Sequence, residues 1–277
     1  MGFKPYPRFV VDYSDRLLVA GQPLYASSVG FIWIGNDTIG NVYELTTSGT
    51  VVTTLPSLPT TGIASNGSSL FLADRVANIT QRTPNGMTIL NSFTTLTGDT
   101  GEDMAWDSTR GVLWEVDHAD TLLKINSSNG AIINSNTLPN TDPMLGSIGA
   151  LGLAYDHTRD LLYVSFCQTG CASFNFGLVE TVDPSTGTVL SVLFRTTGFP
   201  TGGLGYDPST DTLWVGSQDL IRNMTLTGTV LSSFSIPPGN GFADGLEFVP
   251  IPEPGTLLML GTGIVAAFAV VHGKERL

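Results

Sequence analysis

The chain has 277 residues and carries 24 acidic against 12 basic side chains, which gives a formal net charge of -12. Such a surface repels nucleic acid and anionic lipid, so a nucleic-acid-binding role is excluded. Charged residues make up only 13% of the chain, against roughly 25% in ordinary globular domains, whereas 42% of the residues are hydrophobic. This composition predicts one or two domains with a sizeable core and a polar surface of low charge, as in exported proteins.

We expect residues 1–30 to form an N-terminal extension or part of a repeat unit. They contain no recognisable export signal. Lys4 and Arg8 are basic, but Asp12 and Arg16 interrupt the positions that follow, so an apolar run of about seven to fifteen residues is missing. Because export of the body needs such a run, we expect the true start of the protein to lie upstream. The alternative is a protein that stays inside the cell, with an ordinary tail anchor.

A repeated pattern organises residues 31–250. In the three clearest copies, an aromatic residue followed by Asp precedes a second aromatic residue by eight positions. A fainter copy runs from Gly62 to Leu72, and half copies stand at 31–35 and 245–249. The clear copies are Trp106-Asp107 with Trp114, Tyr155-Asp156 with Tyr163, and Tyr206-Asp207 with Trp214.

The spacing of the repeats predicts the fold. With the half copy at 31–35 and the fainter copy included, the second aromatic residues are separated by 38, 43, 49 and 51 positions, close to the period of about 40 to 50 that is typical of propeller blades. They are Trp33, Phe71, Trp114, Tyr163 and Trp214. Each unit predicts four short strands joined by turns rich in Asp, Pro, Ser and Gly, such as 207–211. We therefore predict an all-β fold, a β-propeller of four-stranded blades. Five blades are counted, with 9–20 as a remnant or as part of a sixth.

The two half copies predict how the ring closes. A strand at 245–249 should pair with the strand at 31–35, which leaves no exposed edge. The alternative fold is an open all-β sandwich.

The stretch from Tyr206 to Val215 resembles the YVTN and NHL-type propeller repeat, and the resemblance extends over about residues 32–249. Propellers of this kind serve as lactonases, lyases, scaffolds and ligand-binding modules. The resemblance therefore implies a fold, and the activity has to be argued from the residues of a site.

Catalytic residue patterns are scarce in this sequence. Histidine occurs at 118, 157 and 272, and no HExxH, GxSxG, Walker A or Rossmann glycine pattern stands in a suitable context. We therefore predict a protein that binds a ligand and performs no chemistry of its own. Trp106, Tyr155 and Tyr206 have the chemistry of sugar platforms, but their place in alternating strands predicts core packing.

Four acidic residues predict a calcium site on the propeller axis. When the repeats are aligned, Glu102 and Asp244 occupy the same column, and Asp103 and Glu247 lie beside them. Four carboxylates near one axis need a cation to offset their repulsion, and oxygen ligands suit Ca²⁺. Simple hydration of acidic turns is the alternative. An enzyme built on this site would be a calcium-dependent propeller hydrolase or lyase.

Cys167 and Cys171 are the two cysteines of the chain. The three residues between them include Gly170 and allow the chain to turn back, so an oxidising compartment favours a disulfide that staples this loop. Redox activity usually uses CxxC spacing, and a metal site needs more ligands.

The C-terminal segment 251–277 has a composition unlike that of the body. As a helix, the sixteen uncharged residues 256–271 would rise about 24 Å, which is just enough to cross a membrane. The basic tail that follows should stay in the cytoplasm and place the body on the other side. We predict a transmembrane helix over 256–271; the alternative is a buried C-terminal core helix. The order of elements is Pro252-Glu253-Pro254, the uncharged run, and a tail with Lys274 and Arg276.

This order resembles the PEP-CTERM sorting signal of Gram-negative bacteria, although the tail is less Arg-rich than usual and contains Glu275. The resemblance implies that Pro252, Glu253 and Pro254 are recognised by exosortase, a membrane-embedded cysteine-type transpeptidase. It also implies a transient stay in the inner membrane, in a host that makes exopolysaccharide or biofilm. We expect a monomer that reaches the cell surface or the extracellular space and binds within the matrix, with exopolysaccharide as a partner. A periplasmic scaffold that stays attached by its helix is a further alternative.

Overall fold

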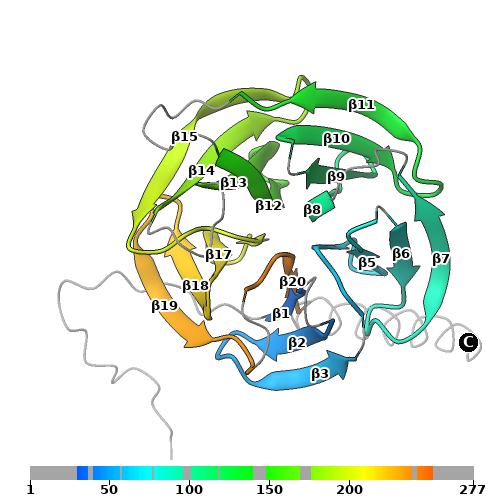
Figure 1. The fold of residues 1–277 in the computed structure, drawn as a ribbon, viewed down its shortest axis with the longest axis horizontal. Coiled ribbons are helices and arrows are strands. Elements are labelled where there is room, and N and C mark those ends of the chain that lie inside the picture. Colours follow the sequence, from blue (N-terminus) through cyan, green and yellow to red (C-terminus); the bar gives the residue numbers. More distant parts are fainter. Residues whose placement is uncertain are drawn as a thin grey trace, which may run out of the picture.

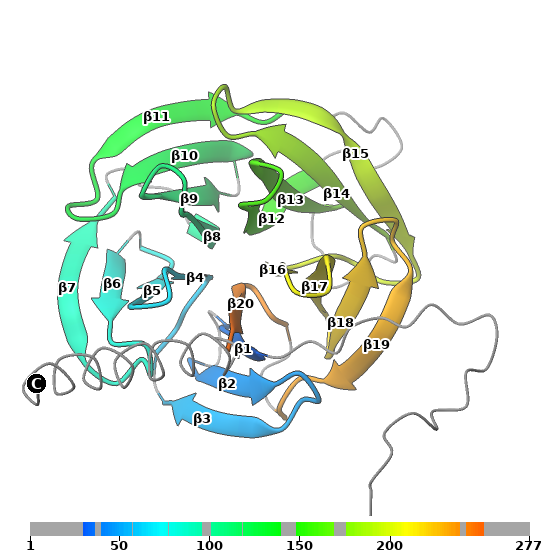
Figure 2. The same ribbon diagram turned by 180° about the vertical axis from the view of Figure 1, so that it is seen from behind.

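The structure is a computed structural model that describes residues 30–36, 40–56, 58–76, 78–95, 101–117, 119–139, 148–168, 176–238 and 242–251. In these residues, twenty strands form five four-stranded antiparallel sheets around one axis (Figures 1 and 2). The predicted all-β propeller with five four-stranded blades is confirmed. The N-terminal extension with its remnant 9–20, and the C-terminal helix, lie outside the described residues.

The four strands of each blade follow one another from the axis to the perimeter, and they are named below in that order. Blade 1 contains β20 (Leu246–Pro250), β1 (Gly30–Ile34), β2 (Val42–Thr46) and β3 (Val51–Leu55). Blade 2 contains β4 (Gly62–Ser65), β5 (Leu70–Ala73), β6 (Asn78–Arg82) and β7 (Ile89–Thr94). Blade 3 contains β8 (Gly101–Asp107), β9 (Val112–Asp117), β10 (Thr121–Asn126) and β11 (Ile132–Thr137). Blade 4 contains β12 (Ile148–Asp156), β13 (Leu161–Gln168), β14 (Phe176–Asp183) and β15 (Thr188–Thr197). Blade 5 contains β16 (Leu204–Asp207), β17 (Thr212–Ser217), β18 (Leu220–Thr225) and β19 (Val230–Ser235).

Blade 1 closes the ring with strands from both ends of the propeller region. β20 pairs antiparallel with β1, with Trp33 opposite Glu247 and Gly30 opposite Pro250. The pairing of the two half copies is therefore confirmed, and the open sandwich is wrong. Closure satisfies the backbone of an innermost edge that would otherwise be free to pair with another chain.

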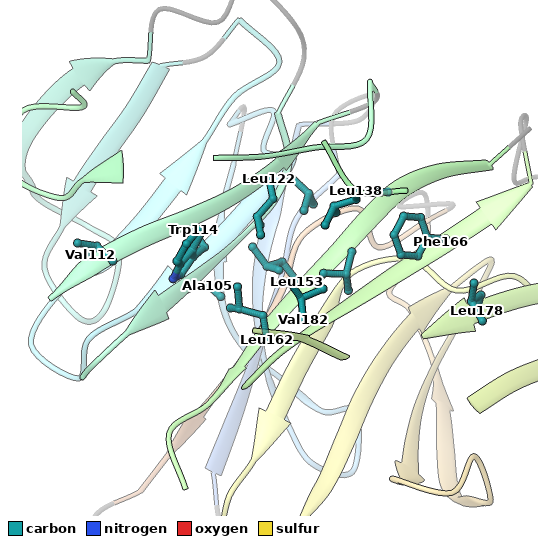
Figure 3. Packing of buried hydrophobic residues seen from close by; sticks show 13 residues of the cluster. Ala105, Val112, Trp114, Leu122, Leu138, Leu153, Leu162, Phe166, Leu178 and Val182 are labelled. Atoms are coloured by element: carbon teal, nitrogen blue, oxygen red, sulfur yellow. The ribbon is translucent and has the colours of Figure 1, made fainter. Parts of the chain in front are cut away.

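The core lies between neighbouring blades. In the cluster between blades 3 and 4, Trp114 and Leu122 pack against Leu153 and Phe166 (Figure 3). The inner strands are covered on both faces by adjacent blades, which explains why β9 and β13 are apolar along most of their length. The outermost strands are covered less and are exposed at most of their positions.

Hydrogen bonds between the aspartate and the second aromatic residue explain the spacing of the repeat in blades 3 and 4. The buried Asp107 accepts the backbone N–H of Arg110 with one oxygen (2.9 Å) and the indole N–H of Trp114 with the other (3.2 Å). In blade 4, Asp156 likewise accepts the hydroxyl of Tyr163 at 2.8 Å. In blades 3 and 4 the aspartate therefore caps the first turn and fixes the aromatic ring of the second strand. In blade 5 Asp207 caps the turn through Ser209 and Thr210, and the Trp214 indole N–H has no hydrogen-bond partner among the described residues.

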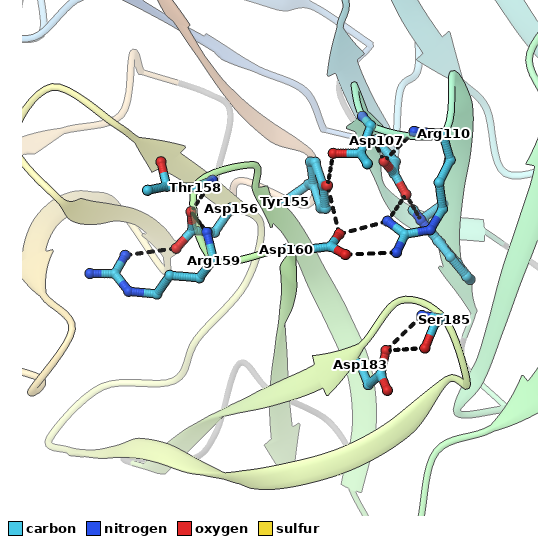
Figure 4. A network of polar contacts seen from close by, with 11 residues as sticks. Asp107, Arg110, Tyr155, Asp156, Thr158, Arg159, Asp160, Asp183 and Ser185 are labelled. Carbon is cyan, nitrogen blue, oxygen red and sulfur yellow. Dashed lines mark hydrogen bonds and ion pairs between the residues drawn. The ribbon is translucent and has the colours of Figure 1, made fainter.

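Two ion pairs, which we call the latches, join the first turns of blades 3, 4 and 5. Figure 4 shows the one between Arg110 and Asp160. Arg110 makes two hydrogen bonds to Asp160 in the next blade, at 2.6 and 2.8 Å, and so lowers the pKa of that carboxyl to about 2. Arg159 binds Asp211 in the same way, at 2.7 and 2.6 Å. Each arginine also contacts the buried aspartate of its own turn.

We expect Arg159→Met to lower the free energy of unfolding by about 1 kcal/mol. Asp211 is half exposed, so solvent screening limits the bidentate pair to ~0.5–1 kcal/mol, and the buried Asp156 loses a further partner. Urea unfolding of Arg159→Met, Asp211→Asn and the double variant measures the coupling. A coupling energy of zero would mean that the pair contributes nothing to the contact between the blades.

Candidate functional site

The innermost strands of all five blades end around a pocket on the axis, which we call the axial pocket. Its volume is about 380 Å³, in the range of pockets for small ligands or for one or two residues of a polymer. The pocket lies at the end of the ring toward which all five innermost strands run. It is lined by Ser65, Asn66, Gly67, Trp106, Ser108, Tyr155, His157, Tyr206, Pro208, Glu247, Phe248, Val249 and Pro250.

Three aromatic residues from equivalent positions form much of the wall. Trp106, Tyr155 and Tyr206 lie near the ends of the innermost strands of blades 3, 4 and 5. Trp106 stacks on Phe71 with ring centroids 5.9 Å apart and an interplanar angle of 7°. The three side chains pack against the buried clusters, as predicted. They also line the axial pocket, which the sequence did not predict.

The tyrosine hydroxyls are held in fixed positions by the latches. The Tyr155 hydroxyl donates to Asp160 at 2.8 Å, and the Tyr206 hydroxyl donates to Asp211 at 2.9 Å. Burial, with the neighbouring Asp160 carboxylate, raises the pKa of Tyr155 to about 12, so this hydroxyl stays neutral in any ordinary buffer. The aromatic wall is therefore preorganised, which lowers the entropic cost of ordering these side chains when a ligand binds.

Glu247 adds a carboxyl group to the pocket wall. The backbone N–H of Ser65 donates to Glu247, whose pKa is raised well above its ordinary value because the group is withdrawn from water. His157 lies in the wall of the same pocket. Aromatic faces, hydroxyls, one carboxyl and one imidazole together suit a neutral ligand rich in hydroxyl groups. The other blades carry Ala64, Ala105, Ala154 and Gly205 at the position of Glu247.

Asp103 lies deeper on the axis and joins four blades. It is fully buried, and its carboxylate accepts four backbone N–H groups, each oxygen accepting two. Burial raises the pKa of Asp103 well above its ordinary value, and the four donors act in the opposite direction. The donors are Ile63 at 3.3 Å, Met104 at 2.8 Å, Leu153 at 3.1 Å and Leu204 at 3.1 Å.

The other four blades carry glycine where blade 3 carries Asp103. A side chain at Gly152 would place its Cβ 2.1 Å from the carbonyl oxygen of Gly202, and the other positions are similarly crowded. Four glycines thus let the innermost strands approach one another, and a single carboxylate fills the centre. The glycines are Gly62, Gly152, Gly203 and Gly245.

The structure does not gather the four predicted calcium ligands. Both oxygens of Asp103 already accept N–H groups, whose positive ends would repel a cation. Glu102 is buried, Asp244 is half-buried beside Gly35, and Glu247 lies in the pocket wall. Among the described residues, no group of three or more His, Cys, Asp or Glu side chains could hold a metal ion. The calcium site stays a prediction, and this geometry gives it no support.

Several predicted residues lie wholly or partly outside the described ranges. Cys167 is buried at the end of β13, but Cys171 lies outside, so the disulfide stays a prediction. The same holds for Pro252, Glu253 and Pro254, and for the predicted membrane span 256–271. Within the described part of the chain, no helix is long and apolar enough to cross a membrane.

Sequence reasoning missed Glu115, a buried acid in β9. Both its carboxylate oxygens are buried and accept no hydrogen bond in the described part of the protein. Burial, with the negative charges of Asp117 and Asp74, raises the pKa of Glu115 to about 8. Its signal in the sequence is a carboxyl at a position that is apolar in the other blades, namely Ile34, Leu72, Val164 and Val215.

We expect the propeller to be more stable at pH 5 than at pH 8. The pKa of Glu115 is higher in the folded protein than its ordinary value of 4.5. The contribution of Glu115 to the free energy of unfolding is therefore fully present below pH 4.5 and is lost as the pH rises toward 8. Asp103 and Glu247 shift in the same direction. Glu115→Gln should flatten the pH dependence of the free energy of unfolding, measured by denaturant titration, whereas Glu44→Gln should leave it unchanged. A slope that is equal in the two variants would refute this role of Glu115.

A family model described as the PEP-CTERM protein-sorting motif matches residues 250–274. The chain carries a PEP-CTERM sorting signal. This signal implies export, with recognition by exosortase and processing at the membrane. The PEP-CTERM motif begins on Pro250, the last residue of β20, so the closing strand runs directly into it.

The first of two similar solved structures shares the fold of this PEP-CTERM protein. A chain in the crystal structure of a nidogen/laminin complex matches with a TM-score of 0.50 and 14% identity, over 79% of this chain and 97% of that one. A protein of unknown function from Bacteroides caccae matches with a TM-score of 0.45 and 11% identity, over 75% and 73%. Among curated proteins, none matches by sequence. At these identities the likeness concerns the fold alone, and function has to be argued from the axial pocket.

Proposed function

We propose that this PEP-CTERM propeller is a binding module for neutral polysaccharide outside the cytoplasm, with the axial pocket as its site. The observation that carries the proposal is the pocket wall, where aromatic residues from three blades stand with Glu247 around a volume of about 380 Å³. Exosortase processing would then deliver the module, as a monomer, to the cell surface or the surrounding matrix.

The chemistry of the axial pocket favours sugars of low charge. Pyranose rings present apolar C–H faces that pack against aromatic side chains, and their hydroxyls find donors and acceptors on Ser108, His157 and Glu247. The net charge of -12 repels acidic polymers. Exopolysaccharide of neutral composition is therefore the expected partner. A calcium-dependent hydrolase or lyase would need a metal centre that the described residues do not assemble.

Binding measurements on the full chain in detergent test the proposal. Affinity electrophoresis and calorimetry with dextran, a soluble β-glucan and alginate should show binding to a neutral polymer and none to alginate. Trp106→Ala should weaken the binding by about tenfold or more, because stacking energy of about 1–1.5 kcal/mol and apolar contact are lost together.

Phe176→Ala is the matched control, since Phe176 is an exposed aromatic residue that does not line the axial pocket. It should bind like the wild-type chain. The proposal fails if no neutral polymer binds, or if Trp106→Ala and Phe176→Ala reduce the binding equally.

A further inference from the structure

The sorting signal leaves the propeller at the mouth of the axial pocket. Pro250 lines this pocket, ends β20 and begins the PEP-CTERM motif. Only residues 251–255 stand between β20 and the uncharged run that starts at 256. Five extended residues reach at most about 18 Å. With the run in a bilayer, the pocket end of the ring is held within that distance of the apolar layer.

The same end of the ring carries exposed aliphatic side chains on its perimeter. Successive strands of a blade alternate in direction, so each outermost strand starts at the end where the innermost strand stops. At or near its start, each outermost strand has an aliphatic residue that is 43% to 56% exposed. These five residues, which we call the aliphatic rim, are Val52, Leu90, Ile133, Leu190 and Val230.

The turns beside the aliphatic rim carry no charge. The five turns between the third and outermost strands, 47–50, 83–88, 127–131, 184–187 and 226–229, contain no Asp, Glu, Lys or Arg, although the chain has 24 acidic residues. The arginines of the latches at this end are paired with aspartates. The turns at the opposite end include Asp74, Asp120 and Asp219. The aspartates of the first turns at the pocket end, Asp107, Asp156, Asp160, Asp207 and Asp211, outnumber the two latch arginines. The part of this end that can approach the bilayer without burying a charge is therefore the aliphatic rim with its uncharged turns.

We propose that the pocket end of the propeller lies against the lipid bilayer, through the aliphatic rim, while the sorting tail is attached. In this arrangement the mouth of the axial pocket faces the membrane until exosortase removes the tail. The proposal rests on the predicted membrane span 256–271 and is independent of the ligand that the pocket binds.

Cysteine labelling in vesicles tests this orientation. Full-length Met87→Cys places a thiol in a turn next to the rim, and Gln218→Cys places one in an exposed turn at the opposite end. Each chain is reconstituted in vesicles of phosphatidylethanolamine and phosphatidylglycerol and treated with a membrane-impermeant maleimide. The unaltered chain gives the background from Cys167 and Cys171. We expect Met87→Cys to react about fivefold or more slowly in vesicles than in detergent, whereas Gln218→Cys reacts at the same rate in both.

A further variant links the protection to the rim. Val52→Ser with Leu90→Ser and Ile133→Ser, in the Met87→Cys chain, should restore most of the detergent labelling rate. Its thermal unfolding should stay cooperative, because the three side chains are about half exposed and lie outside the buried clusters. Two results would overturn the proposal. One is an equal labelling rate of Met87→Cys in vesicles and in detergent, whether both rates are fast or both are slow because a second copy covers the turn. The other is release of the chain from the vesicles by alkaline extraction.

Discussion

Asp103→Ala is expected to prevent the propeller from folding stably. The substitution removes a fully buried carboxylate and leaves four backbone N–H groups from four blades without an acceptor. Each unsatisfied buried donor costs about 1–3 kcal/mol, so the sum of about 4–12 kcal/mol is comparable to the whole stability of about 5–15 kcal/mol of a typical domain. Circular dichroism and urea unfolding of the purified chain measure this loss.

Asp103→Asn keeps the test informative if Asp103→Ala does not fold. The amide keeps the shape of the carboxylate but only one of its two acceptor oxygens, so about half the hydrogen bonds remain and a loss of about 2–6 kcal/mol is expected. Asp219→Asn is the matched control, because Asp219 lies in an exposed turn at a φ of 60° that Asn adopts readily. It should change the stability by less than about 0.5 kcal/mol. Wild-type stability of Asp103→Asn would show that the ring does not depend on its axial carboxylate.

A chain that ends at Asp244 is expected to lose cooperative unfolding. It lacks β20, so β1 becomes an open inner edge, and the buried Leu246 and Phe248 are removed from the cluster between blades 5 and 1. Their loss costs about 2–5 kcal/mol each, and the backbone hydrogen bonds of the β1–β20 pair are lost in addition. Denaturant unfolding followed by tryptophan fluorescence should show no single sharp transition.

A chain that ends at Ile251 is the control for this truncation. It keeps β20 and all five blades and lacks only the tail, so it should unfold in one transition with wild-type stability. If the chain that ends at Asp244 unfolded in the same way as this control, β20 would not be the closing strand.

The sequence predicted the blades well because their signal is local. The spacing from Trp106-Asp107 to Trp114 repeats in blades 4 and 5, and in blades 3 and 4 the aspartate and the second ring meet through one turn and two adjacent strands. The half copies at 31–35 and 245–249 were recognisable because each keeps part of the same apolar pattern. The structure confirms both the five blades and the closing pair.

The chemistry on the axis could not be predicted in the same way. Which side chains face the axis depends on how five strands distant in the sequence converge, so the sequence alone does not show that the Asp103 carboxylate accepts four backbone N–H groups. A signal for it was present: Asp103 stands at a repeat position where the other four blades have glycine. Glu247 and Glu115 likewise replace small or apolar residues of the repeat. In a repeat protein, a polar residue at such a position is therefore a strong candidate for a site residue.

Mass spectrometry of the protein recovered from its native host, with and without the exosortase of that host, tests the central claim most directly. We predict that the exported protein lacks residues 256–271, and that without exosortase the intact chain collects in the membrane fraction. An intact chain, tail included, dissolved in the cytosol of cells that have exosortase would contradict the account.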